Sequence, residues 1–422
     1  MYAFIYTYGC KVNQVESEKI VNDFKLYNLI ITDDIKKADV IILNTCAVTA
    51  NAEKKFRSLI RRAKSEKPST LIAVTGCAAE KDKEKLKSIG ADIVVTNSGK
   101  MDVLKHISEK SDHLESIFDT HGFVEAENIS MATKTRAFVK IQDGCDSNCA
   151  YCIIPSLRGL PVSRAYDSII SEIKNLVNTG YKEIVPVGIH VGKYGMDIAG
   201  EFDLCSLIEG ILKIEGDFRI RLTSIEVNEL TPKMISLLEN NTDKICRHYH
   251  IPLQSGSSQT LERMNRNYTS EEYIDKLTEL KRRIPDCLLG ADVIVGFPGE
   301  TDEHFKETLS TIEKSLLEHL HIFAYSDRSG TKASEMPNKI NGKVKSERAK
   351  FLRAKAAEIK YEAAKKRIGN IYKVLTQKDN TGITDNYFTI KFKEPVEPNI
   401  FIDVLITTAL KDGTLKGDIL YV

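Results

Sequence analysis

Over roughly the first 110 residues, short apolar runs alternate with longer stretches whose apolar residues recur at helical spacing. The runs are continuous, which is typical of strands buried on both faces of a parallel sheet. The pattern therefore predicts an N-terminal α/β unit, a doubly wound parallel sheet with helices on both faces. The expected strands span residues 3–6, 39–43, 71–74 and 93–95, and the expected helices span 13–28, 49–65 and the stretches after 77 and 100.

Farther along the chain, strand candidates followed by helical stretches recur six times. Eight such units would close a barrel, so six predict an open, partial (β/α)6 barrel. In such a barrel, functional side chains are expected at the carboxyl ends of the strands and on the loops that follow them. The six expected strands span residues 137–141, 183–187, 218–223, 246–252, 288–295 and 320–325.

The last fifty or so residues change to closely spaced β segments at 372–375, 387–392, 400–407 and 418–422. This spacing predicts a small all-β barrel. Residues 111–135 are polar and irregular, as expected of a linker. The expected domains are therefore 1–112, 131–366 and 368–422.

Composition narrows the class of protein. The 422 residues are 42% hydrophobic and 28% charged, which is ordinary for a globular chain, and no apolar run approaches membrane-spanning length. A cytoplasmic protein without a membrane partner is expected, and its nine cysteines then indicate metal binding or catalysis in preference to disulfides. The net charge of +1 means that any nucleic-acid surface must be local.

Residues 341–370 form the clearest local concentration of positive charge, with ten lysines and arginines in a helical pattern. Apolar residues at Phe351, Leu352, Ala356, Ile359 and Ala363 predict a packed inner face and a cationic outer face. Such a face could neutralise phosphates, although an ordinary solvated helix explains each lysine equally well. A smaller patch with the same ambiguity comprises Lys54, Lys55, Arg57, Arg61 and Arg62.

Three thiols lie within eight residues on the loop that follows the first expected barrel strand: Cys145, Cys149 and Cys152. A zinc site would normally use four protein ligands, whereas an iron-sulfur cube can be held through three irons and keep the fourth open. Ordinary core thiols are the remaining alternative, but the neighbouring Asp, Ser and Asn make a poor core segment. The pattern therefore favours a 4Fe-4S cluster.

Three more cysteines, Cys10, Cys46 and Cys77, each lie just past an expected N-terminal strand. Since the carboxyl ends of parallel strands share one edge of a sheet, these thiols are expected to lie together and to form a second cluster site. Unrelated small residues in tight turns remain the alternative. Cys205, Cys246 and Cys287 have no partner at ligand spacing and are expected to be buried reduced thiols.

The spacing Cys-x3-Cys-x2-Cys, with Tyr151 before the last Cys, resembles the radical S-adenosylmethionine (SAM) enzymes. The strand-end loops at 188–195, 219–226, 250–257 and 292–300 narrow this resemblance to the methylthiotransferases, with the best match to their threonylcarbamoyladenosine tRNA branch. Residues 382–387 resemble the C-terminal TRAM domain of these enzymes. The resemblance implies a central radical SAM barrel, two 4Fe-4S clusters, SAM as cofactor, and a radical methylthiolation at C2 of N6-threonylcarbamoyladenosine in a tRNA anticodon loop.

The strand-end loops also supply the expected contacts. Glycines there let the backbone approach a ligand closely, and Glu226 and Gln254 could hydrogen-bond it. Plain strand-to-helix turns are the alternative for each residue. The expected SAM-binding residues are Tyr151, Gly188, Ser224, Glu226, Gln254, Ser255, Gly296 and Pro298. The expected substrate-binding residues are Arg158, Arg164, His190, Tyr194 and Tyr387, the last of which could instead fill the small barrel.

Four histidines near strand ends, His190, His248, His250 and His321, could serve either the core or substrate contact. The resemblance implies the anticodon stem-loop of tRNA as partner, an electron-donating reductase such as a flavodoxin or ferredoxin, and a sulfur donor. Two alternatives change the target, to isopentenyladenosine in tRNA or to a ribosomal-protein aspartate. A third makes the chain a non-enzymatic, RNA-binding iron-sulfur sensor.

Overall fold

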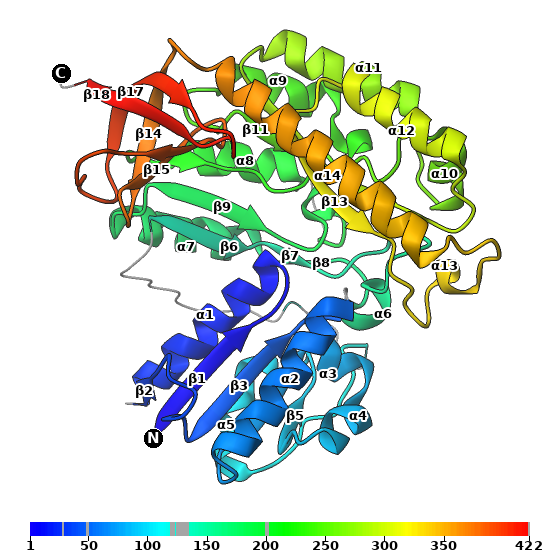
Figure 1. The fold of residues 1–422 in the computed structure, drawn as a ribbon. Helices are drawn as coiled ribbons and strands as arrows, with labels where there is room; N and C mark the ends of the chain where they lie inside the picture. The colour runs from blue at the N-terminus through cyan, green and yellow to red at the C-terminus, as the bar shows by residue number, and fades with distance from the viewer. Residues whose placement is uncertain (28, 48–49, 119–122, 124–134, 199–201, 421–422) are drawn as a thin grey trace.

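In the computed structural model, the described residues are 1–27, 29–47, 50–118, 123, 135–198 and 202–420. They form three packed units that follow one another along the chain (Figure 1). Parts of four expected elements lie outside the described residues. They are most of the linker at 111–135, the start of the helix at 49–65, the last residue of the helix at 13–28 and the last two residues of the strand at 418–422. The boundaries between the three domains stay predictions.

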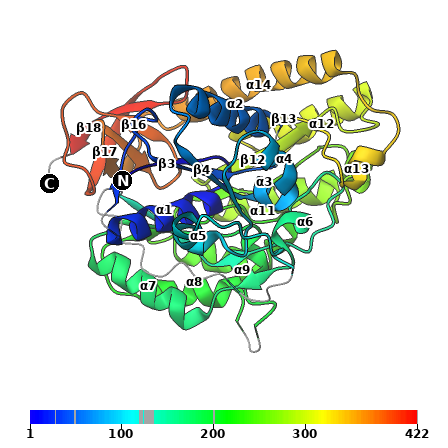
Figure 2. The same cartoon turned by 90° about the horizontal axis from the view of Figure 1, so that it is seen from below.

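The N-terminal unit is a five-stranded, fully parallel sheet with the order β2-β1-β3-β4-β5. Helices α1 and α5 cover one face and α2, α3 and α4 the other, each through its own apolar cluster (Figure 2), which confirms the doubly wound sheet. The strands are β1 (Tyr2–Thr7), β2 (Ile30–Ile31), β3 (Val40–Thr45), β4 (Leu71–Gly76) and β5 (Ile93–Val95). The helices are α1 (Lys11–Leu26), α2 (Ala50–Glu66), α3 (Cys77–Lys81), α4 (Lys83–Ser88), η1 (Lys100–Asp102) and α5 (Val103–Glu109).

The central unit contains two three-stranded parallel sheets, β6-β9-β10 and β11-β12-β13. Parallel bridges between Ile220 and Ile245 and between Ser224 and His250 connect them, so all six expected strands follow one another around a partial barrel. The strands are β6 (Arg136–Lys140), β9 (Glu183–Val187), β10 (Arg219–Ile220), β11 (His248–His250), β12 (Leu288–Val295) and β13 (His319–Ala324), with a short hairpin of β7 (Gln142–Asp143) and β8 (Val162–Ser163).

Helices cover the outside of this barrel and bury one large apolar core against the strands. They are α6 (Pro155–Arg158), α7 (Tyr166–Asn178), η2 (Val191–Lys193), α8 (Leu204–Leu212), η3 (Val227–Glu229), α9 (Pro232–Asn240), α10 (Ser258–Arg263), α11 (Ser270–Arg283), α12 (Asp302–Lys314), α13 (Lys332–Glu335) and α14 (Gly342–Lys365).

The long helix α14 departs from its expected two-faced pattern. Phe351, expected on the packed face, is 55% exposed. Conversely, two arginines expected on the cationic face are buried: Arg348 pairs with Glu300 and Asp302, and Arg367 forms two 2.7 Å hydrogen bonds to Glu318. A buried charge is tolerated when it is paired with an opposite charge. These two arginines are therefore part of the folded core and do not belong to the expected phosphate-binding surface.

The C-terminal unit is a closed five-stranded barrel with the order β14-β15-β16-β18-β17. It confirms the expected small β barrel and adds β15, which the hydrophobic pattern missed because the short segment Thr-Gly-Ile-Thr shows no clear alternation. The strands are β14 (Ile371–Gln377), β15 (Thr381–Thr384), β16 (Thr389–Lys391), β17 (Phe401–Ala409) and β18 (Leu415–Leu420). Within the part of the chain that the structure describes, no helix is long and apolar enough to cross a membrane.

Candidate functional site

The three N-terminal cysteines meet at the carboxyl edge of the first sheet. Strand register explains why: Thr45 on β3 pairs with Gly76 on β4, so Cys46 and Cys77 follow neighbouring strand ends. A Cβ placed on Gly9, beside Cys10, would lie 3.4 Å from the Cys46 sulfur. All three thiols line one cavity of about 640 Å³.

Two glycines in the left-handed region shape this edge. Gly76 has φ +93°, and a Cβ there would lie 2.4 Å from the Thr45 carbonyl oxygen. Gly9 has φ +119° and would press its Cβ against Cys46. Any other residue would be strained at either position, so the glycines let the strand ends turn while the thiols stay close.

Asn13, in the first turn of α1, connects the thiol loops to the central unit. Its amide donates to the carbonyls of Tyr8 (2.9 Å) and Thr45 (3.1 Å), which lie before Cys10 and Cys46. Its Oδ1 accepts a 2.6 Å bond from Arg158 of the central unit. This one side chain therefore fixes two thiol loops relative to the barrel.

Behind Asn13, a buried network of charges joins the two units. Glu16 of α1 accepts from Lys100 (2.6 Å), Lys140 (3.2 Å) and Arg158 (3.1 Å), and all four side chains are buried. Although burial alone would raise the pKa of Glu16, the three cations hold it well below its usual value. Arg158 was expected to contact the substrate, but its buried guanidinium donates to Glu16, Asn13 and Asp143 instead.

The thiol loop of the central unit leaves the barrel between β7 and α6. The Cys145 sulfur lies 3.5 Å from Nδ1 of His190, and the amide of Ser147 donates to it at 3.4 Å. Although burial would raise the pKa of Cys145, these hydrogen bonds lower it. Burial raises the pKa of Cys152 to about 12. The other ring nitrogen of His190, Nε2, donates to the Glu229 carboxylate at 2.6 Å. Glu229 therefore fixes the orientation in which His190 faces Cys145.

Arg266 supports the second thiol of the loop. Its Nη1 donates to the Cys149 sulfur at 3.2 Å, and its Nη2 contacts the carboxylate of Glu226. Tyr151 lies in the same surroundings, where burial and the nearby Cys149 raise its pKa well above 10. Arg266 was not among the expected site residues, since a lone arginine gives no signal of the thiol it will meet in the fold.

The two thiol loops lie against one another. Cys77 packs with Ile153 and Leu157, which directly follow the Cys152 end of the other loop. In the described part of the chain, one group of three metal-binding side chains has all its ligand atoms within 4.8 Å, and it contains no cysteine.

Four of the expected SAM-binding residues differ in their surroundings. Gly188 and Ser224 line the 640 Å³ cavity together with the N-terminal thiols. Ser255 and Pro298 are instead buried, and the Ser255 hydroxyl lies 3.4 Å from that of Thr308. Their roles toward SAM stay predictions.

Two strand-end turns hold the remaining expected contacts. Gln254 has φ +61° and bridges β12 through its backbone. Gly296 has φ +75° and donates its amide to Glu300 at 2.9 Å. Both turns lie where the sequence placed them, at the ends of β11 and β12.

Among the expected substrate contacts, Tyr387 alone lines this cavity. Its ring stacks on His248 with centroids 4.2 Å apart, which brings a residue of the C-terminal barrel into the central one. Arg164 pairs with Glu172 and Tyr194 is 1% exposed, so both are buried away from a tRNA surface. Cys205, Cys246 and Cys287 are buried free thiols, as expected.

The cavity wall also contains polar side chains whose roles the sequence did not decide, and others that the sequence analysis did not name. Lys11, which follows Cys10, lines the cavity together with His248, His250, His319, His321 and Asp292. His248 is 7% exposed, and neither of its ring nitrogens has a hydrogen-bond partner among the described residues. An unpartnered buried imidazole at a cavity wall is typical of a site that completes its hydrogen bonds with a ligand.

Two family descriptions match the chain. The family described as "Uncharacterized protein family UPF0004" matches residues 2–96, and the radical SAM superfamily matches residues 139–312. These ranges coincide with the two units that carry the thiol trios.

Curated relatives cover almost the whole chain. A threonylcarbamoyladenosine tRNA methylthiotransferase of Bacillus subtilis is 38% identical over 92% of this chain and 89% of its own length. The chain belongs to the radical SAM methylthiotransferases. A tRNA-2-methylthio-N(6)-dimethylallyladenosine synthase of Thermoanaerobacter is 33% identical over all of this chain and 93% of its own. Family membership makes the protein an enzyme, which leaves the sensor alternative without support.

The fold has solved counterparts. The radical SAM methyltransferase TsrM of Kitasatospora setae superimposes with a TM-score of 0.55 at 12% identity, covering 79% of this chain and 77% of its own. This likeness confirms the radical SAM fold of the central unit. Membership in the superfamily implies a 4Fe-4S cluster and SAM as cofactors of that unit.

Proposed function

We propose that the enzyme methylthiolates C2 of N6-threonylcarbamoyladenosine in the anticodon loop of tRNA. The observation that carries this choice of base is the polar wall of the 640 Å³ cavity that the N-terminal thiols also line. Lys11, His250, His319 and His321 are among the residues that line it. The threonylcarbamoyl group offers a carboxylate, a hydroxyl and two amide-like nitrogens to such a wall.

The isopentenyl group of the rival base is a hydrocarbon. It would offer no hydrogen bond to His248, whose ring nitrogens have no partner among the described residues, and a site built to hydrogen-bond one substrate rejects an analogue that lacks the polar groups. Lys11 suits an anionic ligand because the positive charges of Arg136 and Arg221 lie near its own. Relatives named for the two bases are similarly distant, at 38% and 33% identity.

Under this proposal, Cys145, Cys149 and Cys152 hold the radical SAM cluster and Cys10, Cys46 and Cys77 hold a second 4Fe-4S cluster. When bound, SAM and the clusters supply the radical chemistry and the methylthio group that an unactivated aromatic C–H requires. The protein's own residues orient the partners. Asn13 and Arg158 fix the N-terminal thiols over the barrel, and Arg266 and His190 hold the thiol loop.

The aromatic and cationic side chains around the cavity mouth would position the base. Tyr387 is held by stacking on His248 and by the Arg221 guanidinium 5.0 Å from its ring centroid. An aromatic ring in the cavity wall is a stacking platform that suits an adenine. The exposed lysines of α14 are proposed phosphate contacts, without Arg348 and Arg367. The reductase and the sulfur donor stay predictions.

The test compares two RNA substrates in anaerobic reactions with reconstituted enzyme, SAM and a reductant. Anticodon stem-loops carrying either threonylcarbamoyladenosine or isopentenyladenosine are digested and their nucleosides measured by mass spectrometry. The expected product is 2-methylthio-threonylcarbamoyladenosine, with at least about a hundredfold preference over the other base. Preferential modification of isopentenyladenosine, or of neither RNA, overturns the proposal. Loss of the same nucleoside from tRNA of cells lacking the gene is the in vivo counterpart.

A further inference from the structure

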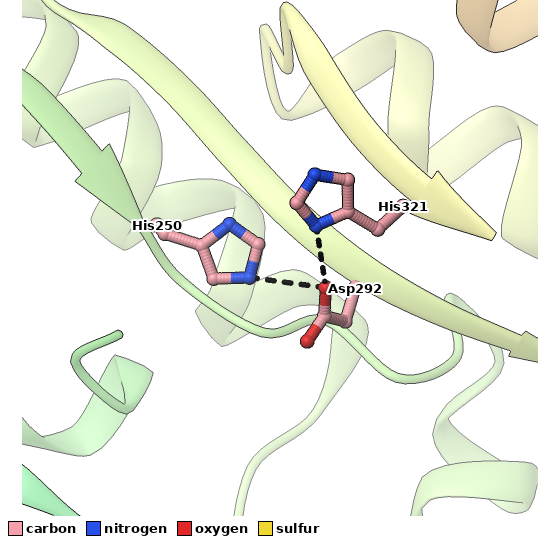
Figure 3. Close-up of side chains that lie close together, drawn as sticks. All are labelled: His250, Asp292 and His321. Atoms are coloured by element: carbon pink, nitrogen blue, oxygen red, sulfur yellow. Dashed lines mark hydrogen bonds and ion pairs between the residues drawn. The ribbon is translucent and has the colours of Figure 1, made fainter. Parts of the chain in front are cut away.

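A second group of ligands lies in the same cavity, away from all six cluster thiols. Figure 3 shows His250 and His321 on either side of Asp292, each pointing a ring nitrogen at the same carboxylate oxygen. Nε2 of His250 and Nδ1 of His321 both lie 3.1 Å from Oδ1 of Asp292. The three residues come from β11, β13 and β12.

Strand register places these side chains together. Asp292 and His321 are direct partners across β12 and β13. His250 pairs with Gly290, two residues before Asp292, so it is a diagonal neighbour on the same face. Gly290 leaves the space that the ring occupies, because a Cβ there would lie 3.2 Å from Nδ1 of His250. The convergence is therefore built into the sheet.

Two imidazoles and one carboxylate are a ligand set that divalent metals of borderline hardness prefer. Throughout the described ranges, this is the one group of three potential ligands whose atoms all lie within 4.8 Å of one another. The side chains remain accessible from the cavity, at 11% exposure for His250, 29% for Asp292 and 51% for His321. An ion could enter there and keep coordination positions open toward the substrate.

We propose that His250, Asp292 and His321 bind one divalent cation, such as Zn²⁺, in the wall of the substrate cavity. The open positions of this ion face the cavity and take an anionic oxygen. If the target is threonylcarbamoyladenosine, as proposed above, that oxygen belongs to the threonyl carboxylate. The cation would then reinforce the choice of this base over a hydrocarbon-bearing one.

The binding test uses enzyme with both clusters reconstituted, without RNA. Zn²⁺ is titrated against a competing chromophoric chelator while iron and sulfide per chain are monitored. The wild type is expected to bind one Zn²⁺ per chain without losing iron. Asp292→Asn and His321→Ala should weaken this binding by at least about a hundredfold, because loss of even a supporting residue costs up to that much.

His319→Ala is the matched control for zinc affinity. His319 packs its ring 4.8 Å from that of His321 but lies outside the group of ligands, so its removal should leave the zinc stoichiometry unchanged. Zinc held adventitiously by thiols would persist in Asp292→Asn, because all nine cysteines remain. Equal zinc binding by wild type and Asp292→Asn, or no stoichiometric binding by the wild type, overturns the cation site.

This outcome is independent of the choice of base. An enzyme that modifies threonylcarbamoyladenosine but binds no zinc overturns the cation site and leaves the proposed function standing. An enzyme that binds zinc and modifies isopentenyladenosine overturns the proposed function. It also overturns the assignment of the substrate's threonyl carboxylate as a ligand of the ion.

Discussion

The two thiol trios are brought together in opposite ways. Cys145, Cys149 and Cys152 are close because one loop of eight residues carries them. Cys10, Cys46 and Cys77 are separated by at least thirty residues and meet because three parallel strands end in register. The first trio needs only its loop and the side chains that hold it, whereas the second needs a whole folded sheet.

This difference changes what can disturb each site. Arg266 and His190 contact the local loop directly. The dispersed trio depends on Asn13 and on the buried charges around Glu16, which hold one unit against another. We therefore expect the local site to lose its cluster when residues of its own loop are changed. The dispersed site should also lose its cluster when packing far from the thiols is changed.

The largest effect is expected from Cys145→Ala. Loss of one of three thiolates should prevent stable binding of the radical SAM cluster, so iron per chain should fall by about four. SAM cleavage, measured as 5'-deoxyadenosine by mass spectrometry under anaerobic conditions, should fall at least about a thousandfold. Cys205→Ala, which removes a buried thiol outside both trios, is the control and should retain cleavage.

Cys46→Ala should separate the two sites. It should also remove about four irons per chain, but 5'-deoxyadenosine should still form because the local loop is intact. The methylthiolated nucleoside should disappear, since the second cluster is proposed to present the sulfur. Equal loss of SAM cleavage in both variants would show that the two trios do not act separately.

Glu16→Gln tests the dependence of the dispersed trio on packing between units. It leaves Lys100, Lys140 and Arg158 without their shared carboxylate, and breaking a buried ion pair costs about 3–5 kcal/mol. The free energy of unfolding, from urea denaturation followed by circular dichroism, should fall by that amount. Glu66→Gln is the surface control, because its pair with Arg62 on α2 is worth at most about 1 kcal/mol. A loss below that of the control contradicts the assigned role of Glu16.

Glu183 provides a comparison in a region that holds neither trio. This buried carboxylate pairs with Arg219 and Arg221, whose guanidinium groups also donate to carbonyls of the C-terminal barrel. Although burial alone would raise its pKa, the arginines lower it from 4.5 to about 2. Its contribution to stability, about 3 kcal/mol, is therefore complete above pH 4.5 and is lost as the pH falls toward 2.

The free energy of unfolding is measured between about pH 6 and about pH 3 in the wild type and in Glu183→Gln. The wild type should lose stability more steeply than the variant as the pH falls. Iron content per chain at neutral pH should be the same in both. Parallel pH profiles would show that Glu183 has the same pKa in the folded and the unfolded protein, which would contradict its stabilising pairing with the two arginines.

Some expectations failed for identifiable physical reasons. Arg158 was expected to contact the substrate, and Arg348 and Arg367 were expected to face phosphates, but each is buried against a carboxylate far away in sequence. Periodicity shows that a residue is charged but does not show what faces it. The group of His250, Asp292 and His321 went unnoticed for the same reason, since strands β11, β12 and β13 bring together residues that are up to seventy-one positions apart.

By itself, the sequence determined the order of strands and helices, the three-part architecture and the local thiol loop, because these depend on hydrophobic periodicity and short-range spacing. The meeting of Cys10, Cys46 and Cys77 could be anticipated from strand ends alone. Only the tertiary structure decided which charges are buried, how α1 connects the N-terminal thiols to the central unit, and which side chains line the cavity beside those thiols. Those features arise from contacts between distant segments, and their free energy depends on what each side chain finds opposite it once the chain has folded.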